Sequence, residues 1–399
     1  MNKVNQNKLM PKLRFPEFKN DDSWEIDNIE NIFISFSGGT PNTSVKEYYG
    51  GNIPFIRSAE INRAITELFI TEQGLKNSSA KLINKGDLLI ALYGANSGDA
   101  AIAKIEGAIN QAILCLRSEY SNTFAYYYFS LKKDWLISNY IQGGQGNLSG
   151  EIIKSFRFCF PKKQEQQKIA ACLSSLDDLI TAENQKLETL KAHKNGLLQN
   201  LFPAEGETVP KLRFNTTGYW EEKPLGKIAQ NLNSKRIPIT ENLRIKGNIP
   251  YIGASGIIDY VKDYIFDDDL LCISEDGANL LMRTYPIAFS ITGKTWVNNH
   301  AHVLKFENKY IQIIVENQLN NKNLEDFLTG MAQPKLNRAK LDLIPIQIPV
   351  STEEQQKIAS HLTASDSLIT LQTQKIESLK LHKKGLMQGL FPDTTEITA

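Results

Sequence analysis

The chain has 399 residues, about two to three times the length of an ordinary domain, so we expect more than one hydrophobic core. Its composition, 41% hydrophobic and 22% charged, excludes a largely disordered or fibrous protein. The net charge of +1 gives no overall basic excess, which counts against DNA binding unless positive side chains form patches or a partner chain supplies them.

Membrane and metal chemistry are not indicated. No segment approaches about 18 consecutive apolar residues, and the first residues lack the apolar run of a signal peptide, so we expect a cytoplasmic protein with no membrane contact. The four cysteines, Cys115, Cys159, Cys172 and Cys272, lack the close spacing of zinc ligands. We therefore expect no bound metal.

Residues 1–160 predict a mixed α and β domain. Short runs rich in β-branched and aromatic residues, such as 87–94, 108–116 and 156–161, indicate strands, and 122–139 predicts a helix. Three loops rich in glycine and side-chain amides interrupt them, at Ser37–Ser44, Tyr93–Asp99 and Gln142–Ser149.

Residues 161–203 predict one long helix. Hydrophobic positions follow one another at spacings of four and three from Ile169 to Leu201, which is the heptad seam of a coiled coil. Pro203 ends the pattern, because a proline disfavours helical backbone in the residue before it. At about 1.5 Å per residue, a helix of about 37 residues would span about 55 Å.

The second half of the chain repeats the first. PKLRF occurs at 11–15 and 210–214, and GNIPFI at 51–56 returns as GNIPYI at 247–252. The helix segment 165–203 returns at 354–392, an offset of 189, with 24 of 39 positions identical. This duplication predicts a second mixed domain over 204–350, with a helix at 310–328, and a second long helix over 351–399.

The predicted fold class is therefore α+β. Two mixed α/β domains are joined by two long helices, and a pseudo-two-fold duplication favours packing of these helices as an antiparallel coiled coil. Polar residues occupy the seam at Glu183, Lys194, Gln372 and Lys383. They are candidates for pairing across the helices, and the alternative is that their ends reach solvent.

No motif supports a catalytic residue. NIPF at 52–55 resembles the Asn/Asp-Pro-Pro-aromatic loop of amino-methyltransferases, but isoleucine replaces the first proline in both copies. We interpret it as the start of a strand with its proline at a sheet edge. His300 and His302 have the spacing of a strand metal pair, which more often binds no metal.

The loops instead predict recognition chemistry. Glycine allows close approach of the backbone to a ligand, while Asn, Gln, Arg and Lys match the hydrogen-bonding edges of bases. Similar loops occur in the second copy at Ser274–Leu281, Val297–His300 and Met331–Arg338, although ordinary turns have the same composition. The candidate DNA-binding residues are Thr40, Asn42, Arg57, Tyr93, Asn96, Gln142, Gln145, Asn147, Lys235, Arg236, Asn279, Asn299, Lys335 and Asn337.

The alternation of variable domains with near-identical helices, PKLRF before each domain, GNIPFI inside it and EQQKIA with a closing LFP in each helix resemble the specificity subunit of type I restriction-modification systems. GGTP at 38–41 is similar to the opening of a target-recognition domain in that family, and the second copy has LNSKRIP at 232–238 instead. The two domains are therefore expected to read different sequences.

The resemblance implies a noncatalytic, cytoplasmic subunit that binds double-stranded DNA. Each recognition domain would read half of a bipartite, asymmetric site, and the helices would set the unread gap. It also implies two modification subunits, which bind S-adenosylmethionine and methylate adenine, and two restriction subunits that use ATP and Mg²⁺. This chain itself would bind no cofactor.

Two other functions are alternatives. A duplicated coiled-coil scaffold could bind proteins and not DNA, although loops rich in amides and poor in large apolar side chains disfavour it. A self-contained methyltransferase would require a cofactor loop, which the residues before NIPF lack.

Overall fold

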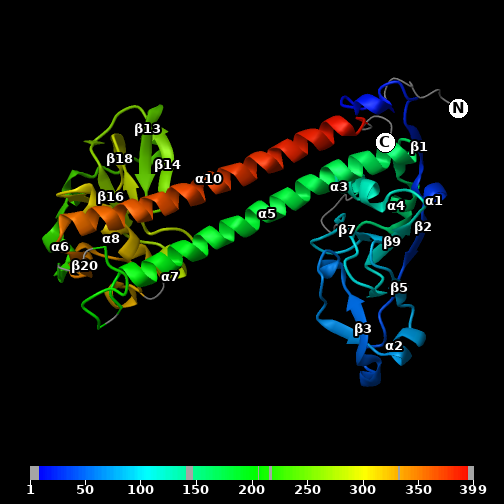
Figure 1. The fold of residues 1–399 in the computed structure, drawn as a ribbon, viewed down its shortest axis with the longest axis horizontal. Coiled ribbons are helices and arrows are strands. Elements are labelled where there is room, and N and C mark those ends of the chain that lie inside the picture. Colours follow the sequence, from blue (N-terminus) through cyan, green and yellow to red (C-terminus); the bar gives the residue numbers. More distant parts are fainter. Residues whose placement is uncertain (1–8, 141–146, 205, 215–217, 331–332, 394–399) are drawn as a thin grey trace. The chain divides into compact units, whose positions relative to one another are not determined.

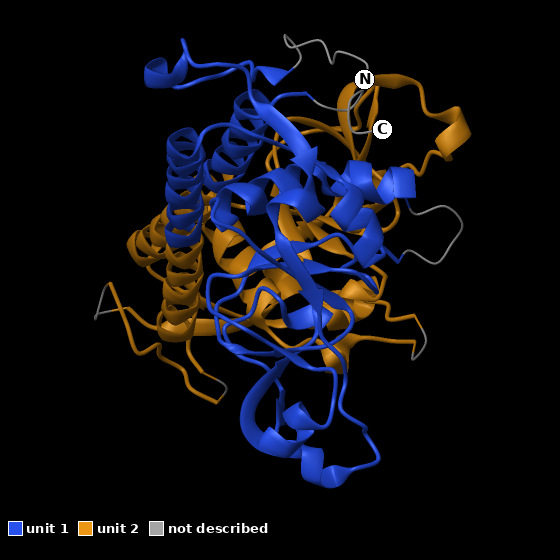
Figure 2. Ribbon diagram, turned by 90° about the vertical axis from the view of Figure 1, so that its right-hand side faces the viewer, with its two compact units in different colours: residues 1–183, 375–399 blue, residues 184–374 orange. Residues whose placement is uncertain are grey.

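The computed structural model describes residues 9–140, 147–204, 206–214, 218–330 and 333–393. The chain divides into two compact units, unit 1 with residues 1–183 and 375–399, and unit 2 with residues 184–374 (Figure 2). Both boundaries fall within the long helices, so each unit contains part of each helix. No helix among the described residues is long and apolar enough to span a membrane.

Unit 1 begins with a mixed domain and continues into the first half of a long helix (Figure 1). Its elements are β1 (Glu25–Asn28), α1 (Ile29–Ile32), β2 (Ile34–Ser37), β3 (Tyr49–Ile56), β4 (Leu68–Ile70), α2 (Glu72–Lys76), β5 (Lys81–Ile83), β6 (Leu88–Ala91), β7 (Ala100–Ile102), β8 (Gly107–Ile109), β9 (Ile113–Arg117), α3 (Asn122–Tyr140), α4 (Gly150–Ser155), β10 (Arg157–Phe160) and the start of α5 (Lys163–Leu201).

Unit 2 repeats the order of the strands, while its short helices differ. Its elements are the end of α5, β11 (Trp220–Pro224), α6 (Leu225–Ile228), β12 (Ala229–Asn231), β13 (Lys246–Gly253), β14 (Gly256–Val261), β15 (Phe266–Asp267), β16 (Leu270–Ser274), α7 (Asn279–Met282), β17 (Ala288–Ile291), β18 (Lys294–Val297), β19 (Ala301–Phe306), α8 (Lys309–Asn321), α9 (Arg338–Asp342), β20 (Pro345–Pro349) and the start of α10 (Thr352–Leu390).

The two units have the same sheet topology. The order β2-β9-β6-β7 in unit 1 matches β12-β19-β16-β17 in unit 2, and β4-β3-β8-β5 matches β14-β13-β18-β15. In each unit one parallel pair, β3 with β8 or β13 with β18, occurs among antiparallel neighbours. The predicted duplication of a mixed α and β domain is confirmed, and the strands of the two units correspond in order.

The GNIPFI strand differs from the prediction. It forms β3, which lies between β4 and β8 and not at a sheet edge. Pro54 lies opposite Phe69 of β4, and the pairing with β8 begins only at Phe55. Because that parallel pairing starts beyond the proline, its missing N–H interrupts no bond to β8.

The second predicted short helix ends earlier than expected. α8 stops at Asn321, and a separate 3-10 turn follows at Glu325–Phe327. The guanidinium of Arg283 donates to the carbonyls of Leu319 and Lys322, which satisfies backbone acceptors at the helix end.

The cores of the two units differ in composition. In unit 1 a cluster of buried aromatic rings includes Trp24, Phe124, Tyr128, Phe158 and Phe391. In unit 2 the largest cluster consists almost entirely of buried leucine, isoleucine and valine, covered by α8. The candidate recognition loops emerge from the ends of the sheets, and each core holds those ends in place.

The long helices pack antiparallel, as predicted. Within unit 1, Asp177 of α5 binds Lys383 of α10 and Glu183 binds Lys375, so rising numbers on one helix meet falling numbers on the other. In unit 2, Lys194 binds Asp366 at 2.5 Å. Asp366 and Lys194 are the repeat counterparts of Asp177 and Lys383, so the same ion pair forms once in each unit. Pairing across the helices is confirmed for Glu183, Lys194 and Lys383, while Gln372 is buried.

Candidate nucleic-acid interface

The loops singled out in the first domain meet at one end of the sheet β2-β9-β6-β7. The amide N–H of Gly38 donates to the carbonyl of Asn110, and that of Leu92 donates to Ala112. Leu148 N–H donates in turn to the Leu92 carbonyl, at 2.9 Å. A side chain at Gly38 would place its Cβ 1.8 Å from the carbonyl oxygen of Ile109, so this close approach requires glycine. The described parts of the three loops thus form one surface.

The candidate residues of unit 1 differ in how far their side chains are exposed on this surface. Asn42, Tyr93 and Asn147 are exposed, and Asn96 is half-buried. Thr40 is exposed and donates a hydrogen bond to Gln111 Oε1 at 2.8 Å. Gln142 and Gln145 lie outside the described residues. Contact of any of these residues with DNA stays a prediction.

Arg57 lies beside this surface, but its guanidinium already binds two carboxylates. It follows β3 where Ile56 pairs with Ile109, so it lies next to Asn110. Its guanidinium donates to the carboxylates of Glu60 and Glu67, the latter at 2.6 Å. The hydrogen bond from Arg57 lowers the pKa of buried Glu60 to about 2. Two carboxylates therefore balance the positive charge of Arg57, and the sequence did not predict these ion pairs.

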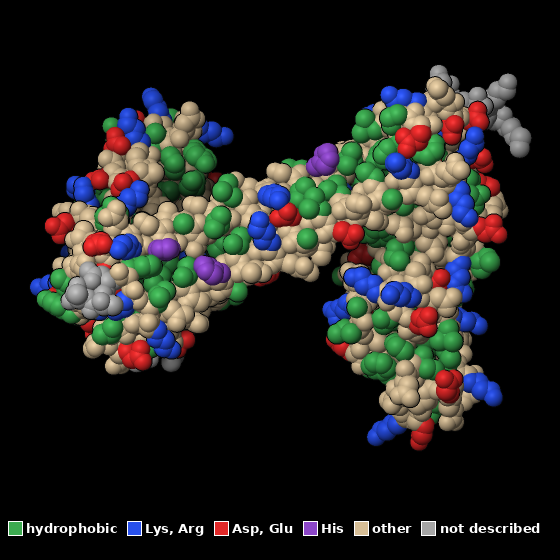
Figure 3. Space-filling model, viewed as in Figure 1, with side chains coloured by type: hydrophobic (Ala, Val, Ile, Leu, Met, Phe, Trp, Pro, Cys, Tyr) green, Lys and Arg blue, Asp and Glu red, His purple; other side chains and the backbone are tan. Residues whose placement is uncertain are grey.

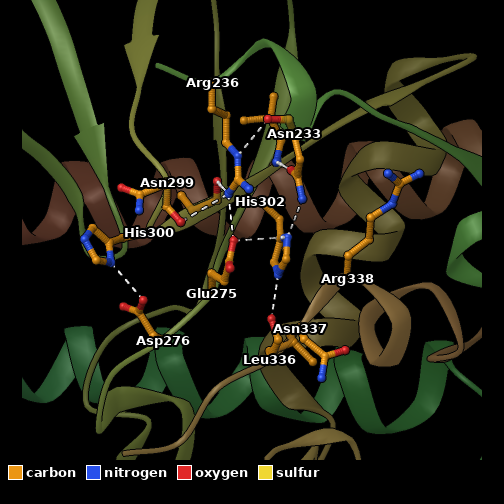
Figure 4. Close-up of polar contacts among 12 residues, drawn as sticks. Asn233, Arg236, Glu275, Asp276, Asn299, His300, His302, Leu336, Asn337 and Arg338 are labelled. Carbon is orange, nitrogen blue, oxygen red and sulfur yellow. Dashed lines mark hydrogen bonds and ion pairs between the residues drawn. The ribbon is translucent and has the colours of Figure 1, made fainter. Parts of the chain in front are cut away.

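The corresponding sheet end in unit 2 gathers the matching loops. Glu275 N–H donates to the carbonyl of His300, and Leu336 N–H donates to the carbonyl of Glu275. These bonds repeat those of Leu92 and Leu148 in unit 1. Figure 4 shows the side chains that converge here from the segments after β12, after β16, before β19 and before α9.

A buried polar network joins these loops. Arg236 Nη1 lies 2.7 Å from Glu275 Oε2 and donates to the carbonyls of Asn299 and Ala301. The Arg236 and Glu275 side chains are only 13% and 14% exposed, so this charge pair ties three loops together away from water. Burial raises the pKa of Glu275, but the hydrogen bond from Arg236 and the charges of Arg236 and Lys335 outweigh it and leave the pKa lowered.

His302 completes the network as a neutral ring. Asn233 Nδ2 lies 2.7 Å from its Nδ1, and its Nε2 lies 2.6 Å from the carbonyl oxygen of Leu336. An amide nitrogen only donates and a carbonyl only accepts, so Nδ1 is the acceptor and Nε2 carries the hydrogen. Burial lowers the pKa of His302, which agrees with this neutral form. His302 thus has no free nitrogen for the metal pair considered with His300.

Other candidates of unit 2 take different positions. Lys235 and Asn299 are exposed, and Lys335 is half-exposed with its Nζ 3.4 Å from Glu275. Asn337 caps α9 by accepting from the N–H of Lys340. Asn279 is buried, and its side-chain amide bonds Thr284 and Tyr285. Asn279 therefore serves the fold, and its contact with DNA stays a prediction, as for the rest of the set.

The sequence placed Glu275, Asp276 and His300 in two candidate loops but did not mark them as candidate DNA-binding residues. Asp276 Oδ2 lies 2.8 Å from His300 Nδ1. Aligning the two copies by strand register offers a signal, because Glu275 and His300 occupy the positions of Leu92 and Ala112. Polar residues in place of apolar ones at matched positions mark a site that differs between the domains.

The surface charge is mixed. On the face of each unit that Figure 3 shows, Lys and Arg side chains are interspersed with Asp and Glu side chains. This agrees with the net charge of +1. On this face, phosphate contacts would therefore come from individual Lys and Arg side chains.

Comparison with known proteins decides the family. The model of the type I restriction modification DNA specificity domain matches residues 21–192 and again residues 218–381. The chain belongs to this family. The predicted resemblance to a type I specificity subunit is confirmed, with two target-recognition domains in one chain, and a scaffold without DNA binding is not favoured.

Individual relatives agree with the family. A specificity subunit of the type I restriction enzyme MjaIX from Methanocaldococcus jannaschii is 27% identical over 349 residues, 79% of each chain. The MjaVIII specificity subunit of the same organism is 23% identical over 96% of this chain and 94% of its own length. The crystal structure of a type I S subunit from M. genitalium shares the fold, with a TM-score of 0.67 and 18% identity over 96% of this chain and 99% of the other. The specificity subunit thus has the two-domain, two-helix fold predicted from its sequence.

Proposed function

We propose that this specificity subunit reads a bipartite, asymmetric DNA site with the two loop surfaces described above, one half-site per recognition domain. We assign residues 1–160 and 204–350 to the recognition domains and residues 161–203 and 351–399 to the helices that set the unread gap. One observation carries the proposal: the same backbone scaffold occurs twice and presents different side chains.

Two backbone hydrogen bonds, Leu92 to Ala112 with Leu148 to Leu92, recur in unit 2 as Glu275 to His300 with Leu336 to Glu275, and one side-chain bond recurs with them. Asn110 Oδ1 accepts from Ala112 N–H at 3.1 Å, and Asn298 Oδ1 accepts from His300 N–H at 2.8 Å. Equal backbone with unequal side chains is what two readers of different sequences require, because backbone position sets the approach and side chains specify the base.

The chain is proposed to perform no chemistry itself. Methylation is assigned to two modification subunits that bind S-adenosylmethionine, and cleavage to two restriction subunits that use ATP and Mg²⁺, all in the cytoplasm. Membership of the specificity family supports these partners. The mixed charge on the face that Figure 3 shows supports them too, because partner chains can add phosphate contacts to those made by this chain.

Selection of binding sites from random double-stranded DNA tests the proposal, with and without modification subunits. Asn299→Ala should relax one position of one half-site and cost about 1–3 kcal/mol there. Lys335→Ala should weaken binding to all sequences alike and lower the salt slope by about one. Lys227→Ala is the matched control, because Lys227 is exposed and precedes β12, at the opposite end of the same sheet.

If neither loop variant changes affinity or sequence preference, DNA is read elsewhere and the proposed surface is wrong. Transfer of radiolabelled methyl groups by the purified chain alone would instead support a self-contained methyltransferase. We expect no transfer until modification subunits are added.

A further inference from the structure

We propose that His300, held by Asp276, is a specificity-determining residue of the second recognition domain, and that it selects a base with an exocyclic amino group, adenine or cytosine. This rests on the proposed function, because it requires that the unit 2 loop surface faces DNA. It adds the chemical class of base read and the residue that reads it.

Two hydrogen bonds hold the main chain of His300 in place. Its N–H donates to Asn298 Oδ1, and its carbonyl accepts from Glu275 N–H. Asp276 directly follows Glu275 and forms a β-bridge with Lys335. The two side chains therefore approach each other from two anchored loops, as Figure 4 shows.

The contact fixes the tautomer of the ring. Asp276 Oδ2 lies 2.8 Å from His300 Nδ1, and an ionised carboxylate can only accept. Nδ1 therefore carries the hydrogen, and in the neutral ring Nε2 presents a lone pair. The His300 side chain is 52% exposed, against 33% for Asp276, so the ring is more open to a ligand than the carboxylate that orients it.

An acceptor in this position discriminates between bases. In the major groove, adenine and cytosine each present an amino group that donates, whereas guanine and thymine present carbonyl acceptors. Nε2 can bond to the first two bases and is left without a hydrogen bond opposite the other two. A buried unpaired acceptor is costly, and this cost is the source of selectivity.

The first domain supports the assignment by contrast. Register places Ala112 where His300 stands and Tyr93 where Asp276 stands, on the same backbone bonds. Unit 1 thus keeps the scaffold but lacks the oriented acceptor. His302, two residues along β19, is 1% exposed with both ring nitrogens bonded, so it stabilises the loops and does not read a base.

The test uses the full chain with its modification subunits and selects binding sites from random double-stranded DNA. We expect His300→Ala to lower discrimination between amino and carbonyl bases at one position about 5- to 150-fold, leaving other positions unchanged. Asp276→Asn should reduce the preference for amino bases over carbonyl bases at this position. The amide that replaces the carboxylate can donate to Nδ1, and Nε2 can then carry the hydrogen and donate to a carbonyl base. His193→Ala, an exposed histidine of α5, is the matched control.

A merely structural role for the pair would change affinity for all sequences and leave the base preference intact, so that result overturns the proposal. Unchanged preference in both variants overturns it as well. If Asn299→Ala and Lys335→Ala still alter DNA binding in that case, the proposed function survives without His300. If they too have no effect, the proposed function itself fails.

Discussion

Arg14 donates two hydrogen bonds to the carboxylate of Glu165, at 2.9 and 2.7 Å, in a buried ion pair between the PKLRF segment and the first turn of α5. The neighbouring Leu13 N–H donates to the carbonyl of Gly389 near the end of α10. PKLRF thus fastens the start of one long helix to the end of the other within unit 1.

Unit 2 contains the same fastening. Arg213 donates to both carboxylate oxygens of Glu354, at 3.1 and 2.7 Å, and Leu212 N–H donates to the carbonyl of Asn200. This explains why PKLRF recurs before each domain.

Removing Arg14 should strongly destabilise unit 1. Glu165 is 1% exposed, so Arg14→Ala leaves a buried carboxylate without its partner, at a cost of about 3–5 kcal/mol. The free energy of unfolding, measured by urea denaturation, checks this. The control is Lys357→Ala, which removes an exposed i,i+4 pair with Glu353 and should cost less than about 0.5 kcal/mol. Equal losses in the two variants would show that the buried pair is not critical.

The stability of unit 2 should fall as the pH is lowered from neutral. Burial lowers the pKa of His302 in the folded chain, so below about pH 6.5 the unfolded chain binds this proton more readily. The loss continues down to the folded pKa, at no more than about 1.4 kcal/mol per pH unit. Urea denaturation at pH 7.5 and pH 5.5 measures it, and His302→Gln should have the smaller difference. A variant with the same pH dependence as the parent would assign the effect to other groups.

Exchange of residues 1–160 for the corresponding domain of another specificity subunit should change one half of the recognised site only. The first domain contains a buried cluster made only of its own residues, such as Ile56, Leu89 and Ile109, and has its own loop surface, so the second half-site and the gap should persist. Mapping of methylated sites in a complex with modification subunits decides the matter. A change in both halves would contradict independent reading.

Insertion of four residues after Thr181 should lengthen the unread gap. Four residues add about 6 Å of helix at 1.5 Å per residue, which corresponds to about one or two base pairs. The insertion lies between Asp177 and Glu183, whose partners are Lys383 and Lys375, so α10 must change its register. Methylation mapping should return both half-sites unchanged. An unchanged gap with full activity would mean that the helices do not set the distance.

The sequence by itself determined the repetitive features of this protein. The heptad seam, the offset of 189 and the recurrence of PKLRF depend only on which residue follows which, and they predict two long helices, two mixed domains and antiparallel packing. The family follows from the same features, because they extend over most of the chain.

Only the tertiary structure decided which candidate side chains are available. Arg57 forms ion pairs with Glu60 and Glu67, and Asn279 is buried, where its side chain serves the fold. His300 becomes an oriented acceptor only because the strand register brings it to Asp276, 24 residues away in the chain. Periodicity reports which face of an element is apolar, whereas the partner of a polar group depends on which loops the sheet brings together.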